Sequence, residues 1–191
     1  MSLVDAKISE SGLRILGEYI GSTRKITELD ISWNTLKPRA YEVLLTSLSQ
    51  SRSITHLNLS WNTLFEDENH AEDYKKEESE IKNDETVWYM QVKLNAFNKS
   101  VINLLSEIIK KNKSLLHLNL DATGLSEATV CMIGKTMRRA KSLLSIHLSN
   151  NPGTSPRAVK TISETIHAYT RKNLLHQEFR LKQLMSNFAN D

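Results

Sequence analysis

The sequence ITELDISWNTL at residues 26–36 returns almost unchanged as ITHLNLSWNTL at residues 54–64, which is an offset of 28. Two later stretches, LLHLNLDATGL at residues 115–125 and LLSIHLSNN at residues 143–151, are related by the same offset of 28. The distance from residue 54 to residue 115 is 61, which is 28 plus 33 additional residues. A fixed period of this length indicates a repeat architecture, in which each unit buries its apolar face only by stacking on its neighbours.

The segments between these stretches are amphipathic. Ala40, Val43, Leu44 and Leu48 recur at helical spacing, and the same offset counted upstream from Leu44 reaches Leu16. Apolar residues at this period predict a helix with one apolar face. Each such segment is followed by a short polar turn. We therefore expect every unit to consist of a short strand, an asparagine-bearing turn and a helix.

The pattern L-x-x-L-x-L-x-x-N on a 28-residue helical unit resembles the leucine-rich repeats of the ribonuclease-inhibitor-like type. The resemblance covers nearly the whole chain except residues 65–98 and the last eighteen residues. It implies an α/β solenoid, a right-handed β-α superhelix with a short parallel sheet inside and helices outside. The family includes repeat domains of nucleotide-binding immune receptors, the Ran GTPase-activating protein and several ciliary axoneme proteins. The pattern is specific for the fold and not for the function.

The repeat assigns inward positions to Leu29, Ile31 and Leu36, which neighbouring units must cover. The same offset counted upstream from Ile31 and Leu36 reaches Leu3 and Ile8. The chain therefore begins inside a repeat unit. Residues 3–25 are either a degenerate cap or part of a longer array.

The asparagine of each unit is expected to bond the backbone of the adjoining turn, so that Asn34 and Asn62 form a ladder inside the bend. Thr123 occupies this position in the third unit, where we expect the ladder to be weaker. Asn151 restores the asparagine in the fourth unit. Pro152 and Gly153 follow it, where the repeat pattern usually has a leucine.

Residues 65–98 interrupt the second unit between its strand and its helix. Residues 65–86 hold ten acids against three bases, a charge of −7 within a chain of net charge +3. An acidic block without an apolar face is typical of a solvated, disordered segment. Residues 87–94 are apolar and predict a strand or a short helix, in which Trp88 either caps the solenoid or belongs to a partner-binding loop.

We divide the chain into a leucine-rich-repeat domain at residues 1–173, interrupted at residues 65–98, and a C-terminal amphipathic helix at residues 174–191. That last helix either caps the repeats or docks on a partner. The helix before it begins at Ser155 and Pro156, a capping residue followed by a proline at the first helical position. Its expected buried face consists of Val159, Ile162, Ile166 and Tyr169.

Sequence motifs of catalysis are missing from the chain. It has no G-x-x-x-x-G-K or G-x-G-x-x-G loop, no C-x-x-C pair, no H-E-x-x-H and no G-x-S-x-G. Cys131 is the single cysteine, which excludes an internal disulfide and fits a reducing, cytoplasmic location. No apolar run is long enough to span a membrane, and the N-terminus has no secretory pattern. We expect no enzyme activity, no cofactor and no metal.

The candidate binding residues come from strand positions that the 28-residue period places side by side on the concave face. The two rows are Glu28, His56, His117, Ser145 and Asp30, Asn58, Asn119, His147. Neighbours in a row are about 4.8 Å apart, so Glu28 could pair with His56, and His56 with His117. A metal or acid–base site and a plain polar binding face are the two interpretations of these histidines.

Trp33 and Trp61 occupy the same position in consecutive units, directly before Asn34 and Asn62. We expect the two indoles to lie side by side at the edge of the concave sheet. Either they are exposed and form the centre of a binding surface, with the strand residues as a polar surround, or they lie flat on neighbouring turns and shield them.

Two basic groups, at residues 110–113 and residues 135–141, close helices in adjacent units, where cations favour the helix C-terminus. They alternatively form a patch for an acidic partner or for the acidic segment of the chain itself. Aromatic residues do not interleave with these bases, which disfavours a nucleic-acid partner.

The function that this pattern favours is a non-catalytic protein-binding or scaffold module that belongs to a larger complex. The family resemblance favours a subunit of a ciliary or cytoskeletal assembly. A regulator of a GTPase and the sensor repeat domain of an immune-receptor-like protein are the alternatives.

Overall fold

The computed structural model describes residues 1–34, 38–65 and 84–164, apart from the side chains of residue 39 and residues 84–95. Several predictions from sequence therefore lie outside the described residues. They concern the inward position of Leu36, the acidic part of the insertion at residues 66–83, the side chain of Trp88, the burial of Ile166 and Tyr169, and the amphipathic helix at residues 174–191.

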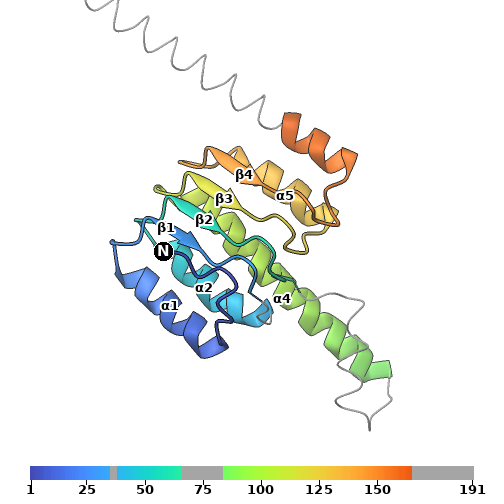
Figure 1. The fold of residues 1–191 in the computed structure, drawn as a ribbon. Helices are drawn as coiled ribbons and strands as arrows, with labels where there is room; N and C mark the ends of the chain where they lie inside the picture. Colours follow the sequence, from blue (N-terminus) through green and yellow to red (C-terminus); the bar gives the residue numbers. More distant parts are fainter. Residues whose placement is uncertain (35–37, 66–83, 165–191) are drawn as a thin grey trace, which may run out of the picture.

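A single parallel sheet contains one strand from each unit, in the order β1-β2-β3-β4 (Figure 1). The strands are β1 Glu28–Asp30, β2 His56–Asn58, β3 His117–Asn119 and β4 Ser145–His147. Leu29 lies opposite Leu57, Leu57 opposite Leu118, and Leu118 opposite Ile146. The register is the one that the repeat offsets predict, so the longer second unit does not displace the strands.

Helices lie on one side of this sheet and pack against one another in chain order (Figure 1). They are α1 Glu10–Ser22, α2 Pro38–Gln50, α4 Asp84–Lys111 and α5 Glu127–Met137, and residues 156–164 form one more helical segment. The α/β class, with a short parallel sheet inside and helices outside, is confirmed.

The core fills the space between the sheet and the helices. Leu29, Leu57 and Leu118 point inward from the strands and are at most 1% exposed, and Leu44 and Leu105 face them from α2 and α4. Burying a leucine side chain contributes about 1.5–3 kcal/mol, and no unit encloses its own leucines. One expected core residue is wrong: Val43 is 43% exposed.

Residues 1–5 extend the sheet pattern by one partial unit. Ser2 bridges Asp30 in parallel, and the amide of Leu3 donates to the Asp30 carbonyl at 2.7 Å. Leu3 and Ile8 are partly buried against the core. These residues therefore form the end of a repeat unit, as the repeat period predicts.

The asparagine ladder forms at the bend of each unit. The Asn62 side-chain amide donates to the carbonyls of Ile31, Leu59 and Ser60, and its Oδ1 accepts from the amide of Asn34 at 2.8 Å. These groups are buried, where an unpaired amide or carbonyl costs about 1–3 kcal/mol. The ladder therefore ties each turn to the preceding one.

Tyr41 on α2 strengthens the same bend. Its side chain is fully buried, and its hydroxyl donates to Asn62 Oδ1 at 2.5 Å and lies 3.3 Å from the Asn34 carbonyl. Burial raises the pKa of the Tyr41 hydroxyl far above its ordinary value. It stays a protonated donor at every physiological pH.

The third unit has a reduced form of this network. The Thr123 hydroxyl donates to the Leu120 carbonyl at 2.8 Å, whereas the Asn151 amide donates to the carbonyls of Leu120, Leu148 and Ser149. Asn151 Oδ1 accepts from the Thr123 amide at 2.9 Å. One hydroxyl hydrogen replaces two amide hydrogens, which is the physical basis of the weaker ladder expected there.

The C-terminal part of the insertion is helical. α4 runs without a break from Asp84 to Lys111, so residues 84–98 extend the helix of the repeat toward its N-terminus. The strand alternative for residues 87–94 is thereby wrong. In Figure 1 the first part of α4 extends beyond the layer of the other helices, and the buried Phe97 marks where the helix meets the core.

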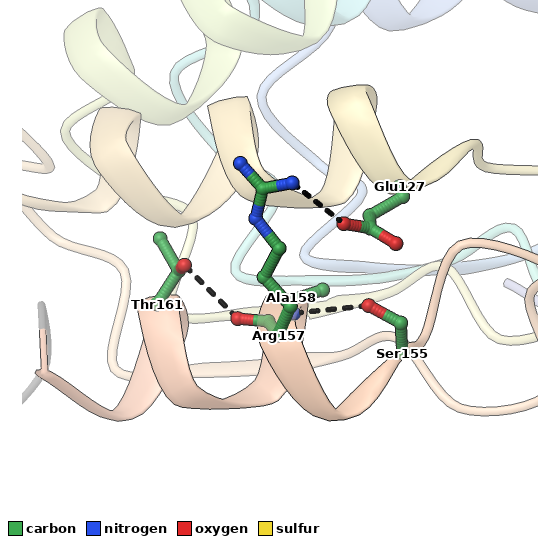
Figure 2. Close-up of polar contacts among 5 residues, drawn as sticks. All are labelled: Glu127, Ser155, Arg157, Ala158 and Thr161. Atoms are coloured by element: carbon green, nitrogen blue, oxygen red, sulfur yellow. Dashed lines mark hydrogen bonds and ion pairs between the residues drawn. The ribbon is translucent and has the colours of Figure 1, made fainter.

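The last helical segment begins as predicted but presents a different face. Ser155 Oγ accepts from the amide of Ala158 at 3.1 Å, and Arg157 forms an ion pair with Glu127 of α5 at 3.7 Å (Figure 2). Ala158 is fully buried, whereas Val159 is 52% exposed, so the prediction of Val159 as buried is wrong. The small alanine lets the segment lie close to α5, and Ile162 packs partly against the core.

Candidate functional site

The side of the sheet that faces away from the helices carries all nine residues predicted for partner binding. Glu28, His56, His117 and Ser145 form one row, and Asp30, Asn58, Asn119 and His147 form the next. The central residue of each strand points the other way, into the core. Trp33 and Trp61 follow the first two strands after two residues each.

The two tryptophans form a stacked pair. Their ring centroids are 4.4 Å apart and their planes differ by 10°. Trp33 is 52% exposed and Trp61 is 47% exposed. The rings thus cover each other, and about half of each side chain stays exposed.

A left-handed backbone underlies this pair. Asp5, Trp33, Trp61, Ala122 and Asn150 stand at the same repeat position, and their φ angles are 47°, 60°, 56°, 51° and 57°. Left-handed backbone costs an ordinary residue about 1–2 kcal/mol, and only glycine, asparagine and aspartate adopt it readily. Tryptophan is unusual at such a position, and the same conformation at Asp5, Ala122 and Asn150 shows that it belongs to the repeat.

Carboxylates lie beside the pair on the same face. Asp30 Oδ1 accepts from the Ser32 amide at 2.9 Å and from the Ser32 hydroxyl at 2.7 Å, and Oδ2 accepts from the Asn58 side chain at 3.0 Å. These bonds fix the direction of the Asp30 carboxylate. The side chain of Glu28 is exposed, and it forms no ion pair with His56 although the two are register partners.

The three histidines of the face make a row of imidazoles across β2, β3 and β4. The ring centroids of His56 and His117 are 5.7 Å apart, and those of His117 and His147 are 4.8 Å apart. Burial and the like charges of His147 and His56 lower the pKa of His117. The diagonal contact between His117 and His147 is closer than the in-row contact that the sequence pattern emphasises.

Two participants were not recognised in the sequence. Asp5 continues the tryptophan position into the first partial unit, and the repeat offset counted upstream from Trp33 would have found it. Tyr41 supports the bend beneath the tryptophans through Asn62, a role for which the helical periodicity of α2 gives no signal.

The described residues form neither a metal-binding cluster nor a membrane-spanning helix. No group of three or more His, Cys, Asp or Glu side chains there has the geometry to hold a metal ion. Among the same residues, no helix combines the length and apolar character needed to cross a membrane.

Comparisons with known proteins agree with this architecture. The sequence model described as a leucine-rich repeat matches residues 50–68, and no curated protein matches the chain significantly. A solved structure of the leiomodin-1 actin-binding site 2 is similar with a TM-score of 0.57 and 13% identity, over 94% of this chain and 87% of that one. The C-terminal domain of tropomodulin from Caenorhabditis elegans is similar with a TM-score of 0.61 and 15% identity, over 93% of this chain and 87% of that one.

At these identities the two structures establish the fold and nothing further. The strand-turn-helix unit, its regular repetition and the match at residues 50–68 converge on one family. The chain has a leucine-rich-repeat fold, and its repeats are consistent with the ribonuclease-inhibitor-like type.

Proposed function

We propose that this protein is a non-catalytic protein-binding module of the cytoskeleton, and that it binds its partner through Trp33, Trp61 and the adjacent outward residues of β1 and β2. Actin is the first partner to test, because one similar structure bears the name of an actin-binding site. A role in cilia is a narrower form of the proposal and rests on family resemblance alone.

The stacked, half-exposed tryptophan pair is the observation that carries the proposal. About half of each side chain remains exposed, so each indole could bury roughly 75–125 Å² more in a complex. At about 25 cal/mol per Å², that is a gross gain of roughly 2–3 kcal/mol for each ring, before association costs. Tryptophan is among the residues most often found at the energetic centre of a protein interface.

The polar surround supports the same interpretation. Asp30 accepts from Ser32, Asn58 accepts from Ser60, and the Asn58 side chain donates to Asp30, so the two side chains offer a partner preorganised acceptors at little entropic cost. His56 and Glu28 lie next to them with exposed side chains. An aromatic centre within a polar rim is the usual composition of a protein interface.

The test is co-sedimentation of the full chain with actin filaments, together with its retention by immobilised actin monomers. We expect binding that the double change Trp33→Ala with Trp61→Ala weakens at least about thirtyfold, equivalent to about 2 kcal/mol. Ile15→Ala is the matched control, because Ile15 is 62% exposed but lies on α1, away from the sheet.

Two results would contradict the proposal. The cytoskeletal assignment fails if neither form of actin binds the chain. The assignment of the surface fails if the double variant binds as well as the Ile15→Ala control.

A further inference from the structure

The sheet face differs in charge from the rest of the protein. The chain has a net charge of +3. The outward strand residues and the left-handed position of each unit nevertheless include three carboxylates, those of Asp5, Glu28 and Asp30, and no lysine or arginine. Near neutral pH, with its histidines uncharged, this set of side chains carries −3 on a basic protein.

No ion pair holds these carboxylates within the described part of the chain. The ion pairs found there join Lys111 to Glu107, Arg157 to Glu127, and Lys160 to Glu164, all on helices. The Met1 ammonium group donates to the Glu28 backbone carbonyl and not to its carboxylate. The bonds that orient Asp30 come from neutral donors, so its negative charge stays available to a cation from a partner.

The tryptophans add a second attraction for cations. Each ring has one face in the stack and one face turned outward along the row. Asp5 is the next residue of the row beyond Trp33, and Ala122 is the next beyond Trp61. A methyl group is too small to cover an indole, and a guanidinium or ammonium group over such a face is attracted by the negative face of the ring.

We infer that the partner segment bound at this face is basic, with an arginine or lysine that lies against the tryptophan pair and contacts Glu28 and Asp30. This inference rests on the proposed function and specifies the chemistry of the partner. Charge complementarity is the argument for the occupant: an acidic, aromatic face on a protein of opposite net charge selects a cationic segment.

The histidine row makes this selectivity dependent on pH. His56 faces Glu28 on β1 and His117 on β3, and His117 faces His147 on β4. Asp121, two residues after the end of β3, adds a further carboxylate, whose Oδ1 accepts from the Ser149 amide at 2.6 Å. Protonation of these histidines adds positive charge beside the carboxylates, so acidification reduces the net negative charge that attracts a basic segment.

The direct test uses two synthetic twelve-residue probes, one with arginine and the other with glutamate at alternate positions between glycines. Each is titrated at pH 7.5 and low salt into the isotope-labelled full chain. We expect the arginine probe alone to shift the indole N–H resonances of Trp33 and Trp61 in a saturable way. Equal or stronger binding of the glutamate probe would overturn the inference.

Charge variants test whether the carboxylates of this face, and not those elsewhere on the surface, attract the arginine probe. Glu28→Gln with Asp30→Asn should weaken binding of the arginine probe at least fivefold, because asparagine keeps an acceptor but loses the charge. Glu18→Gln removes an exposed carboxylate from α1 and should have no effect. Equal binding by both variants would overturn the inference.

Acidification to pH 5.5 should weaken binding of the arginine probe at least threefold. A variant that combines His56→Gln, His117→Gln and His147→Gln should lose this dependence. A pH dependence that persists in that variant would contradict the role given to the histidines.

If sedimentation velocity shows that the chain self-associates as its concentration rises, the face instead binds a second copy of the chain. If the probes fail while the tryptophan variant still loses actin, the partner chemistry is wrong and the proposed function stands.

Discussion

Trp33 and Trp61 stand in the first two units where Ala122 and Asn150 stand in the last two, and all four residues have left-handed backbone. The backbone is held in the same way in the first three of them. The amides of Trp33, Trp61 and Ala122 donate to the carbonyls of Ser60, Asp121 and Ser149 in the next unit, at 3.1, 2.9 and 3.0 Å. The conformation is thus set by bonds between units and not by the side chain.

The scaffold tolerates these indoles but does not need them. A methyl group and an amide occupy the position in the last two units without changing the turn. Asparagine would fit the left-handed backbone with less strain. The tryptophans are therefore best explained by contact with a binding partner. For this reason we place the binding surface in the first two units.

The two halves also differ at the residue that closes the bend. Leu64 and Leu125 occupy this position in the second and third units and are fully buried. Gly153 stands there in the fourth unit, where its amide donates to the Leu125 carbonyl at 2.8 Å. A Cβ on Gly153 would lie 2.1 Å from the Ser126 carbonyl carbon and 2.3 Å from the Glu127 amide nitrogen. The backbone itself fills the space that leucine fills elsewhere.

The largest effect is expected for Gly153→Ala. Its Cβ would collide with the backbone at the start of α5, which cannot rotate away as a side chain can, so we expect a loss of about 3 kcal/mol or more. Urea unfolding monitored by circular dichroism measures it. Gly21→Ala is the control: its Cβ meets nothing closer than 3.9 Å, and removing a helical glycine should stabilise by about 0.5 kcal/mol. Equal stability of the two variants would contradict the close approach.

The next largest effect is the loss of stability when the asparagine ladder is cut in the second unit, compared with the third. Asn62→Ala removes the acceptor of the Asn34 amide and the Tyr41 hydroxyl, and the donor to three carbonyls, so we expect a loss of about 3 kcal/mol. Thr123→Ala removes one hydroxyl and should cost about 1 kcal/mol. Similar losses in urea unfolding would show that the ladder is no weaker in the third unit.

A smaller effect is expected for Trp33→Asn combined with Trp61→Asn. Asparagine relieves the left-handed strain, whereas loss of the stack costs about 0.5–1.5 kcal/mol, so stability should change by no more than about 1 kcal/mol. Binding to the partner should nevertheless be lost. A variant that unfolds well below the wild-type urea midpoint would show that the tryptophan pair stabilises the fold. The presence of tryptophan in the first two units would then need no partner to explain it.

The fold could be predicted from the sequence because each repeat unit can be compared with the others. A residue such as Leu29 has counterparts one repeat period away, and a strand register follows from the offset alone. The rows of outward residues and the pairing of Trp33 with Trp61 followed from the same arithmetic.

Features that occur once were not predictable in this way. The continuation of α4 back to Asp84 has no counterpart in another unit. Its start lies within an acidic segment that has no apolar periodicity to indicate a helix. The burial of Ala158 in place of Val159 depends on how the last helical segment meets α5, which periodicity along one helix does not specify. Left-handed backbone at a tryptophan contradicts local preference, so only the structure reveals it.

The smallest effect concerns the histidines, which occur as a contacting row only from β2 to β4. The pKa of His117 is lowered in the folded protein by burial and by His147 and His56, so the unfolded chain binds a proton at a higher pH than the folded one. Stability is therefore fully present above the ordinary pKa of about 6.5 and falls as the pH drops through the lowered one. The face is largely open to water, so we expect the fall in Tm from this group to stay below about 2 °C. Thermal unfolding at pH 7.5 and pH 5 measures it, and His117→Gln should flatten the difference relative to the wild type. A steeper loss of stability in the His117→Gln variant would mean that other groups, and not repulsion within this row, dominate the acid response.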